Sequence, residues 1–334
     1  MPAELLINEG EASMMYVGDV PWHGLGTKLD KPATAAQAIQ AAKLDWEVEK
    51  RPLSYSNRDG HVIEMPDRYA VVPGQGWMHQ SQPTFGIVSK SFVPLQNREA
   101  FSFFDPIVGK GAAVYHTAGA LGDGERIWIL AKLPSQIRVV GDDITDKYLL
   151  LSNSHDGHGA VQIKFTPIRV VCNNTLTLAL SQGPTIRVTH SRDMHERLKQ
   201  ADRMLGIINE RYDALAETFQ NMVKVQMIDG LIGHYLAKVF PDPADPADER
   251  AAKRVHYERA CAEHLYEHGA GVDIPGVRGS LWAAYNGVTE YVDHRAMKTS
   301  NDGRLNSIWF GNGYLTKARA FDAATTMLAG ASLN

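Results

Sequence analysis

The chain has 334 residues, 44% hydrophobic and 22% charged, an ordinary globular composition with enough length for two modest cores. Its formal net charge of −4 argues against a general attraction to nucleic acid or to an anionic membrane, so any anion site must be a local basic patch. The only cysteines, Cys172 and Cys261, are far apart, which argues against a disulfide framework or a thiolate zinc site and favours a reducing cytoplasm. No apolar run approaches the roughly 20 residues that span a bilayer, and residues 1–10 lack the basic and apolar segments of a signal peptide. We therefore expect neither export nor a membrane-embedded segment.

Two helices are predicted in the first part of the chain. Residues 34–43 are rich in alanine behind a cap at Thr34, and residues 97–108 show aromatic spacing behind a cap at Asn97. Both are expected to pack on a sheet.

Strand-like patterns dominate residues 46–190, where short β-branched and aromatic runs are separated by Gly, Pro, Asn and Asp. Residues 48–55 and 61–72 flank the segment 57–60, whose Asp-Gly pair supplies the positive φ angles of a tight turn, so they predict a β-hairpin. Further strands are predicted at 126–133, 148–153, 161–165 and 186–188. In 161–165 the alternation predicts that Val161, Ile163 and Phe165 are buried and that Gln162 and Lys164 face the other way.

The clearest periodic signal is a heptad stripe in the second half of the chain. Its apolar members recur at alternating steps of four and three: Met194, Leu198, Ala201, Leu205, Ile208, Tyr212, Leu215, Phe219 and Met222. The stripe predicts one long amphipathic helix that starts near Ser191 and Asp193, ends at Asp229 and Gly230, and extends on the order of 50 Å at 1.5 Å per residue. The stripe has two candidate partners, the later helices of the same chain and a second subunit, and the sequence leaves both open.

Helices also dominate the rest of the chain. The prolines of 241–246 predict a loop, and residues 249–268, 280–294 and 315–328 predict helices. The sequence therefore predicts an α+β fold of two domains. The first, residues 1–190, is a β-rich α+β domain in which helices pack on the sheet. It is followed by a helical domain at 191–334 that begins with the long heptad-patterned helix.

Two short segments contain residues typical of metal or catalytic sites. His155, Asp156 and His158 place two imidazoles and a carboxylate within four residues and could hold a divalent metal if further ligands joined them, while Gly157 and Gly159 favour a surface turn. Trp22 and His23 lie in a Pro- and Gly-rich loop at 21–26 and suit either a core anchor or a binding site.

Other reactive residues favour structural roles. Asp142, Asp143 and Asp146 with Lys147 predict a solvated turn rather than a Mg²⁺ site, and Cys172 predicts a small buried thiol rather than a nucleophile. The glycines between 109 and 124 lack the Gly-Lys-Ser/Thr ending of a phosphate loop, so nucleotide hydrolysis is not predicted.

Cations interleaved with an aromatic residue are predicted on the polar faces of neighbouring strands. Single-stranded nucleic acid requires this combination, because Lys and Arg contact phosphates while bases stack on aromatic rings. The candidate nucleic-acid-binding residues are Arg126, Trp128, Lys132, Lys164, Arg169 and Arg187. An ordinary solvated sheet face with scattered cations is the alternative. A second candidate patch near Trp309 and Phe310 comprises Arg295, Lys298, Arg304, Lys317 and Arg319.

Several motifs resemble the phage/plasmid-like family of mobile elements, of the domain-of-unknown-function 932 type. In chain order they are Pro-Trp-His-Gly-Leu-Gly-Thr at 21–27, Phe-Gly-Ile-Val at 85–88 followed by Pro-Leu-Gln-Asn-Arg-Glu-Ala-Phe at 94–101, Arg-Val-Val-Cys-Asn-Asn-Thr-Leu at 169–176, Leu-Trp-Ala-Ala-Tyr-Asn-Gly-Val-Thr-Glu-Tyr at 281–291, and Trp-Phe-Gly at 309–311. The resemblance covers nearly the whole chain. It implies a setting in replication, recombination or a contest with host defence, and it assigns no catalytic residues because the family has no agreed activity.

Three functional hypotheses follow. The leading one is an oligomeric single-stranded DNA-binding protein that promotes strand annealing, with no cofactor and no bond-making chemistry. Single-strand annealing proteins contain a β-β-β-α domain and a more helical C-terminal part, and the order of elements predicted for this chain is compatible with theirs. The second is a metal-dependent enzyme that acts on nucleic acid through His23, His155 and His158. The third is an interaction protein that blocks a host factor through the heptad helix.

Overall fold

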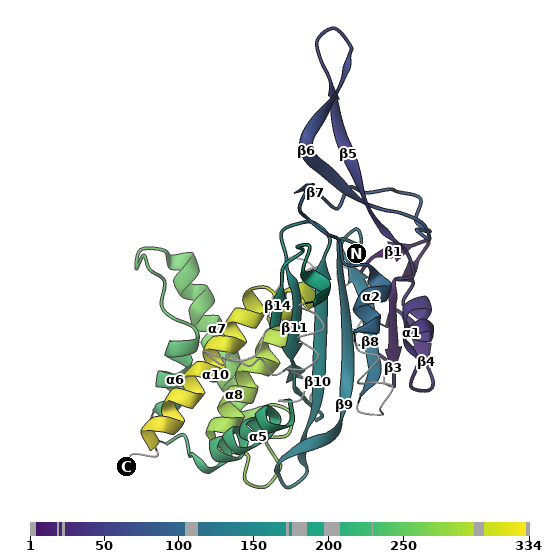
Figure 1. Cartoon of the computed structure of the whole chain (residues 1–334). Coiled ribbons are helices and arrows are strands. Elements are labelled where there is room, and N and C mark those ends of the chain that lie inside the picture. The colour runs from purple at the N-terminus through teal and green to yellow at the C-terminus, as the bar shows by residue number, and fades with distance from the viewer. Residues whose placement is uncertain are drawn as a thin grey trace. The chain divides into compact units, whose positions relative to one another are not determined.

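The computed structural model describes residues 5–18, 20–21, 24–103, 113–171, 174–175, 186–196, 208–228, 230–296 and 304–331 (Figure 1). Within them the chain is mixed α and β, with a β-rich first half and helices toward the C-terminus, as predicted. The chain divides into two compact units. Unit 1 comprises Met1–Pro134, Leu149–Lys164 and Pro184–Gly206, and unit 2 comprises Ser135–Tyr148, Phe165–Gly183 and Ile207–Asn334. The predicted boundary after residue 190 stays a prediction.

Among the described residues, unit 1 contains most of the strands and the short helices α1 and α2. Its strands are β1 (Ile7–Asn8), β2 (Glu11–Ala12), β3 (Met14–Val17), β4 (Thr27–Leu29), β5 (Val48–Ser56), β6 (Val62–Pro73), β7 (Gly86–Ser89), β8 (Val114–Leu121), most of β11 (Val161–Phe165) and β14 (Ile186–Val188). Helix α1 spans Ala35–Ala41 and helix α2 spans Asn97–Ser102. The long strands β9 (Arg126–Val140) and β10 (Asp143–Ser154) contribute residues to both units.

The predicted hairpin is confirmed by β5 and β6, which pair antiparallel. Its turn forms because the Asn57 side chain accepts from the backbone N–H groups of Asp59 and His61, and Gly60 adopts a φ of +83° that disfavours other residues. β7 adds a third strand, pairing with β6 only over residues 68–71.

The larger sheet provides the frame for the candidate site. In unit 1, β4 pairs parallel with β3, β3 pairs antiparallel with β8, and β8 pairs antiparallel with β9. β10 lies between β9 and β11, and β14 pairs antiparallel with β11, with Arg187 directly opposite Gln162. Along β11, Val161 and Ile163 are buried as predicted, but Phe165 is only half-buried and Lys164 is buried as well. Both faces of β11 are therefore largely covered.

The caps of the two helices in unit 1 differ in how well the sequence predicted them. Thr34 caps α1 as predicted and forms a reciprocal capping box with Gln37. The prediction of Asn97 as a cap is wrong, because Gln96 occupies that position. Asn97 lies inside α2, fully buried, and its side chain donates to the carbonyls of Leu44 and Trp46.

The acidic segment at 142–147 is mostly not a solvated turn. Gly141 and Asp142 form a turn, but Asp143, Asp146 and Lys147 belong to β10 and are buried. The turn prediction is wrong for these three residues because Asp143 and Asp146 have partners that make burial tolerable. Arg169 neutralises the Asp143 carboxylate, and Gln136 donates to Asp146 at 2.7 Å.

Unit 2 contains short strands and most of the helices. They are β12 (Ile168–Arg169), β13 (Asn174–Thr175), α5 (Ile208–Lys224), α6 (Leu231–Val239), α7 (Glu249–His268), α8 (Leu281–Glu290), the π-helix η3 (Tyr291–Arg295), α9 (Arg304–Trp309) and α10 (Asn312–Ala331). The predicted loop at 241–246 and the three predicted helices after it are confirmed. α8 has no solvent-facing side, since all ten of its residues are buried. None of the described helices is both long and apolar enough to cross a membrane.

The predicted long helix is described only in part, because residues 197–207 lie outside the described segments. α5 ends at Lys224, before the predicted stop, and Gly230 instead precedes α6 with a φ of +80°. Within α5 the stripe residues Tyr212, Leu215, Phe219 and Met222 are buried. The ring of Phe219 lies 4.6 Å from that of Trp282 in α8 and 6.4 Å from that of Phe321 in α10. This part of the stripe thus packs on later helices of the same chain.

Candidate nucleic-acid interface

Three of the predicted cations lie together in unit 1. Lys164 is two residues from Gln162 on β11 and so points to the same face, which brings it diagonally close to Arg187 on β14. Arg126 is the first residue of β9, and its charge also acts on Lys164. We call Arg126, Lys164 and Arg187 the cationic cluster.

The electrostatics of the cationic cluster favour an anion. Lys164 is only 8% exposed, and its burial, followed by the positive charges of Arg187 and Arg126, lowers its pKa to about 8. Bringing like charges together costs free energy, and an anion placed among them reduces that cost. Arg187 is exposed and Arg126 is half-buried, so the cluster can be reached from solvent.

Lys132 lies outside the cationic cluster. It is half-buried and follows Arg126 by six residues on β9, a distance of about 20 Å at 3.3 Å per residue.

The predicted solvent-facing position of Trp128 is wrong. Its side chain is fully buried, and its Nε1 donates to Thr117 Oγ1 at 3.3 Å. The ring lies over Gly119, the residue opposite it on β8, where even a Cβ atom would overlap it. Trp128 therefore fills the core and cannot stack on a base.

The predicted solvent-facing position of Arg169 is also wrong. Arg169 belongs to unit 2 and is fully buried. Its Nε and Nη2 donate to the two carboxylate oxygens of Asp143 at 2.8 and 2.5 Å, and its Nη1 donates to the Ala270 carbonyl at 2.9 Å. Trp282 Nε1 donates to the same carboxylate at 2.8 Å. Arg169 is thus part of a buried ion pair, which alternation along a two-residue strand could not reveal.

The histidine segment forms a core contact followed by a surface turn. His155 is fully buried, and this burial, together with the nearby His190, lowers its pKa to about 3. Its Nδ1 accepts from Asn153 at 3.3 Å, so its Nε2 carries the proton and donates to Asn97 Oδ1 at 3.1 Å. Both ring nitrogens are therefore occupied.

The remaining residues of this segment match the surface-turn alternative. Asp156 Oδ1 accepts from Ser154 Oγ and from the His158 backbone N–H, both at 2.7 Å, and Gly157 has a φ of +80°. In the part of the chain that the structure describes, no group of three His, Cys, Asp or Glu residues is placed to hold a metal. Trp22, His23 and Cys172 lie outside the described residues.

The second predicted patch, near the C-terminus, is wrong for Lys317. This residue is fully buried, and its Nζ donates to Asp293 Oδ1 at 2.7 Å. Arg319 is held by the Val239 carbonyl at 3.0 Å. Lys298 and the side chain of Arg304 lie outside the described residues.

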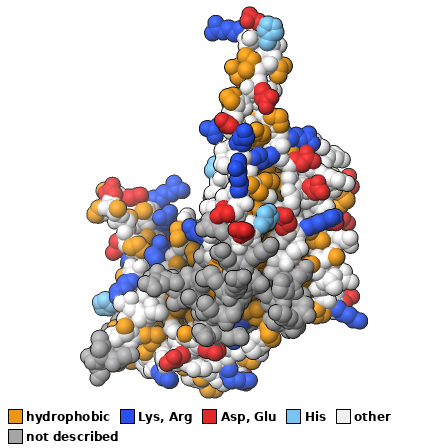
Figure 2. Space-filling view, viewed as in Figure 1, with side chains coloured by type: hydrophobic (Ala, Val, Ile, Leu, Met, Phe, Trp, Pro, Cys, Tyr) orange, Lys and Arg blue, Asp and Glu red, His pale blue; other side chains and the backbone are white. Residues whose placement is uncertain are grey.

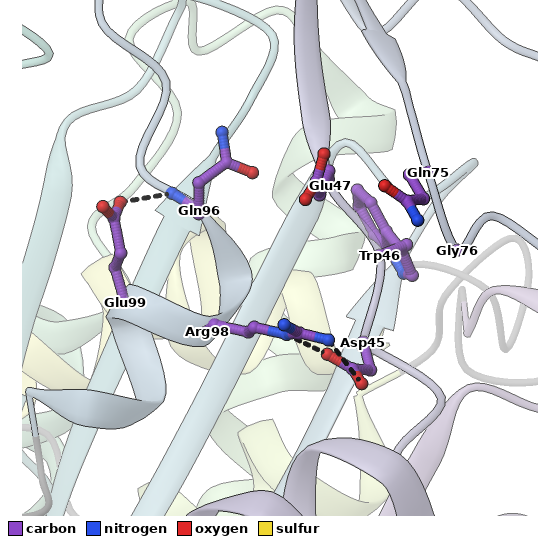
Figure 3. A pocket seen from close by; sticks show the side chains of 8 residues that line it. All are labelled: Asp45, Trp46, Glu47, Gln75, Gly76, Gln96, Arg98 and Glu99. Carbon is purple, nitrogen blue, oxygen red and sulfur yellow. Dashed lines mark hydrogen bonds and ion pairs between the residues drawn. The ribbon is translucent and has the colours of Figure 1, made fainter.

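Sequence reasoning missed a pocket of about 430 Å³ in unit 1, where α2 meets the start of β5 (Figure 3). Its lining residues are Asp45, Trp46, Glu47, Gln75, Gly76, Gln96, Arg98 and Glu99. Arg98 donates twice to Asp45, at 2.5 and 3.0 Å, and Gln96 exchanges two hydrogen bonds with the Val48 backbone. Glu99 accepts from the Gln96 backbone N–H at 2.9 Å. These polar groups mainly tie α2 to the strand; the signal for this role was the capping-box spacing of Gln96 and Glu99.

A comparison with protein families adds one match. The model of a domain of unknown function, DUF932, matches residues 84–309, more than half of the chain. The chain belongs to the DUF932 family. The resemblance to the domain-of-unknown-function 932 type is thereby confirmed over residues 84–309. No curated protein and no solved structure matches the chain significantly. All three residues of the cationic cluster lie inside the DUF932 match, whereas the β5–β6 hairpin precedes it.

Proposed function

We propose that this DUF932 protein is an oligomeric single-stranded DNA-binding protein of a mobile element that promotes strand annealing in recombination or replication. The observation that carries the proposal is the cationic cluster, in which Arg126 and Arg187 act on the partly desolvated Lys164. A phosphate group among these side chains relieves their repulsion, which gives the site a preference for a polyanion.

The burial of Trp128 supports one mode of binding. Without that ring, the cluster contacts the phosphate backbone and leaves the bases unstacked on the protein, so binding has little sequence preference. An annealing protein benefits from this arrangement, because base edges must stay free to pair with a complementary strand. The proposed reaction needs no cofactor and makes no covalent bond.

Salt dependence gives the proposal a magnitude. Each phosphate contact to a single strand contributes about −0.7 to the slope of log K against log salt, so three contacts per subunit give a slope of about −2. The mobile-element setting rests on the sequence motifs alone, which resemble those of phage- and plasmid-borne proteins, and handling single strands is an expected task in that setting.

The test measures binding of a fluorescently labelled oligothymidylate by anisotropy over a salt series. Arg187→Ala should weaken binding and reduce the slope by about 0.7, because Arg187 is the exposed member of the cluster. Lys28→Ala is the charge-matched control, since Lys28 is an exposed cation of unit 1 on β4. Equal affinity of wild type and Arg187→Ala, or no binding by wild type at low salt, would refute the proposal.

A further inference from the structure

The outer part of the β5–β6 hairpin, residues 53–67, is a two-stranded ribbon with exposed apolar side chains. We call it the distal arm; Figure 1 shows it extending beyond β7, which pairs with β6 only from residue 68 onward. The exposed fractions are 53% for Tyr55, 72% for Val62, 39% for Ile63 and 39% for Met65. Tyr55 and Ile63 are directly opposite, and Met65 follows on the same face, so these three form an apolar stripe.

Such a ribbon is poorly stabilised by itself. A two-stranded hairpin is marginally stable in water, and apolar side chains on it gain free energy only when another surface covers them. Its backbone edges also offer unpaired groups to a further strand. A partner for the distal arm is therefore expected, and its charge indicates which kind.

The charge of the distal arm changes sign from its tip to its base. The distal arm contains Arg58 and three carboxylates, a net charge of −2 with His61 neutral: Asp59, Glu64 and Asp67. The arm base, which we define as residues 48–52, 68–73 and 86–90, has one carboxylate, Glu49, and four cations, a net charge of +3: Lys50, Arg51, Arg68 and Lys90. Figure 2 shows Lys and Arg side chains gathered at the foot of the hairpin.

We propose that the partner of the distal arm is a second copy of this chain, with the two arms packed antiparallel so that each acidic distal arm lies against the basic arm base of the other. This arrangement is self-complementary, as a two-fold contact between identical chains requires, and it covers both apolar stripes. A net charge of −2 makes the distal arm a poor partner for nucleic acid. The expectation of an oligomer rests on the proposed function, while the contact itself rests on the arm.

A charge-swap experiment tests the arrangement by sedimentation velocity on the full chain. One variant reverses the tip with Asp59→Lys and Glu64→Lys, and the other reverses the base with Arg68→Glu and Lys90→Glu; all four side chains are exposed. Each variant alone should associate at least tenfold more weakly than wild type, because its tip and base have charges of the same sign. An equimolar mixture should regain association, since each distal arm then meets an arm base of opposite charge.

The controls separate this contact from folding and from DNA binding. Lys28→Glu with Lys31→Glu reverses two exposed cations outside the arm and should leave association unchanged. Tyr55→Ser with Ile63→Ser should weaken association while the circular dichroism spectrum of the folded chain stays unchanged. Oligothymidylate binding through the cationic cluster should persist in the charge-swapped chains.

Several outcomes would overturn the inference. They are a monomeric wild type, reversed variants that associate as wild type does, and a mixture that fails to reassociate. Variants that associate normally but lose DNA binding would place nucleic acid on the arm instead. A failure of DNA binding with intact charge-swap behaviour would refute the proposed function and leave the arm contact standing.

Discussion

Replacing Arg169 with leucine should destabilise the protein strongly. Arg169 supplies three hydrogen bonds within unit 2, two of them to the fully buried Asp143 carboxylate. The substitution leaves that carboxylate without its charge partner, and removing one member of a buried ion pair costs about 3–5 kcal/mol. Because a whole domain is stable by about 5–15 kcal/mol, we expect a large drop in the midpoint of urea unfolding.

The second substitution Asp143→Asn shows whether the uncompensated charge is the cause. In the double variant position 143 carries no charge, so part of the loss should be recovered, with a coupling free energy of about 2–3 kcal/mol. Oligothymidylate binding by the folded fraction of the Arg169→Leu variant should be unchanged, because Arg169 is inaccessible. A loss of stability below about 1 kcal/mol, or lost DNA binding at full stability, would refute this reasoning.

Three further predictions concern other buried groups. The pKa of His155 is near 6.5 in the unfolded chain and about 3 in the fold, so the fold favours the neutral imidazole. The free energy of unfolding should therefore fall by about 2.5 kcal/mol as the pH drops from 7 to 4.5, a range that lies below the unfolded pKa and above the folded one. The midpoint of urea unfolding, plotted against pH over this range, should fall clearly less steeply in His155→Gln than in wild type. Because the pKa of Lys164 is about 8, its charged fraction falls from about nine-tenths at pH 7 to about one-tenth at pH 9. The affinity of wild type for oligothymidylate should therefore fall over this range. The affinity of Lys164→Arg should not, because arginine stays charged. Phe219→Ala should cost about 3–5 kcal/mol in thermal or urea unfolding, since its fully buried ring contacts those of Trp282 and Phe321; a cost below about 1 kcal/mol would contradict the assigned packing.

Local sequence signals predicted local structure well. The β5–β6 hairpin follows from one Asp-Gly turn between two strand-like runs, and α1 follows from the cap at Thr34. These elements depend on contacts between residues close in sequence. The exposed apolar stripe of the arm was not predicted. Strand alternation can tell which side chains share a face, but it cannot tell whether other residues cover that face, and the face with Tyr55 and Ile63 is exposed.

Burial of polar groups was harder to predict, since it depends on residues distant in sequence. Asp143 was expected in a solvated turn, yet its partners are Arg169, 26 residues later, and Trp282, 139 residues later. The same limit applies to His155, whose ring is held by Asn97 from 58 residues earlier. A single sequence gives the residue types of such pairs but no signal for their proximity.

Position within the sheet explains why some predicted binding residues remain accessible. Arg126, Trp128 and Lys132 share one face of β9 by alternation, yet Trp128 is fully buried whereas Arg126, at the start of the strand, is half-buried. Arg187 is exposed because β14 pairs only with β11 among the described strands and so lies at an edge. Lys164 lies between these cases, buried enough for its pKa to fall and close enough to Arg187 to share a ligand. An edge strand beside a partly desolvated lysine thus concentrates positive charge on a chain whose net charge is negative, and this local excess is what a phosphate backbone requires.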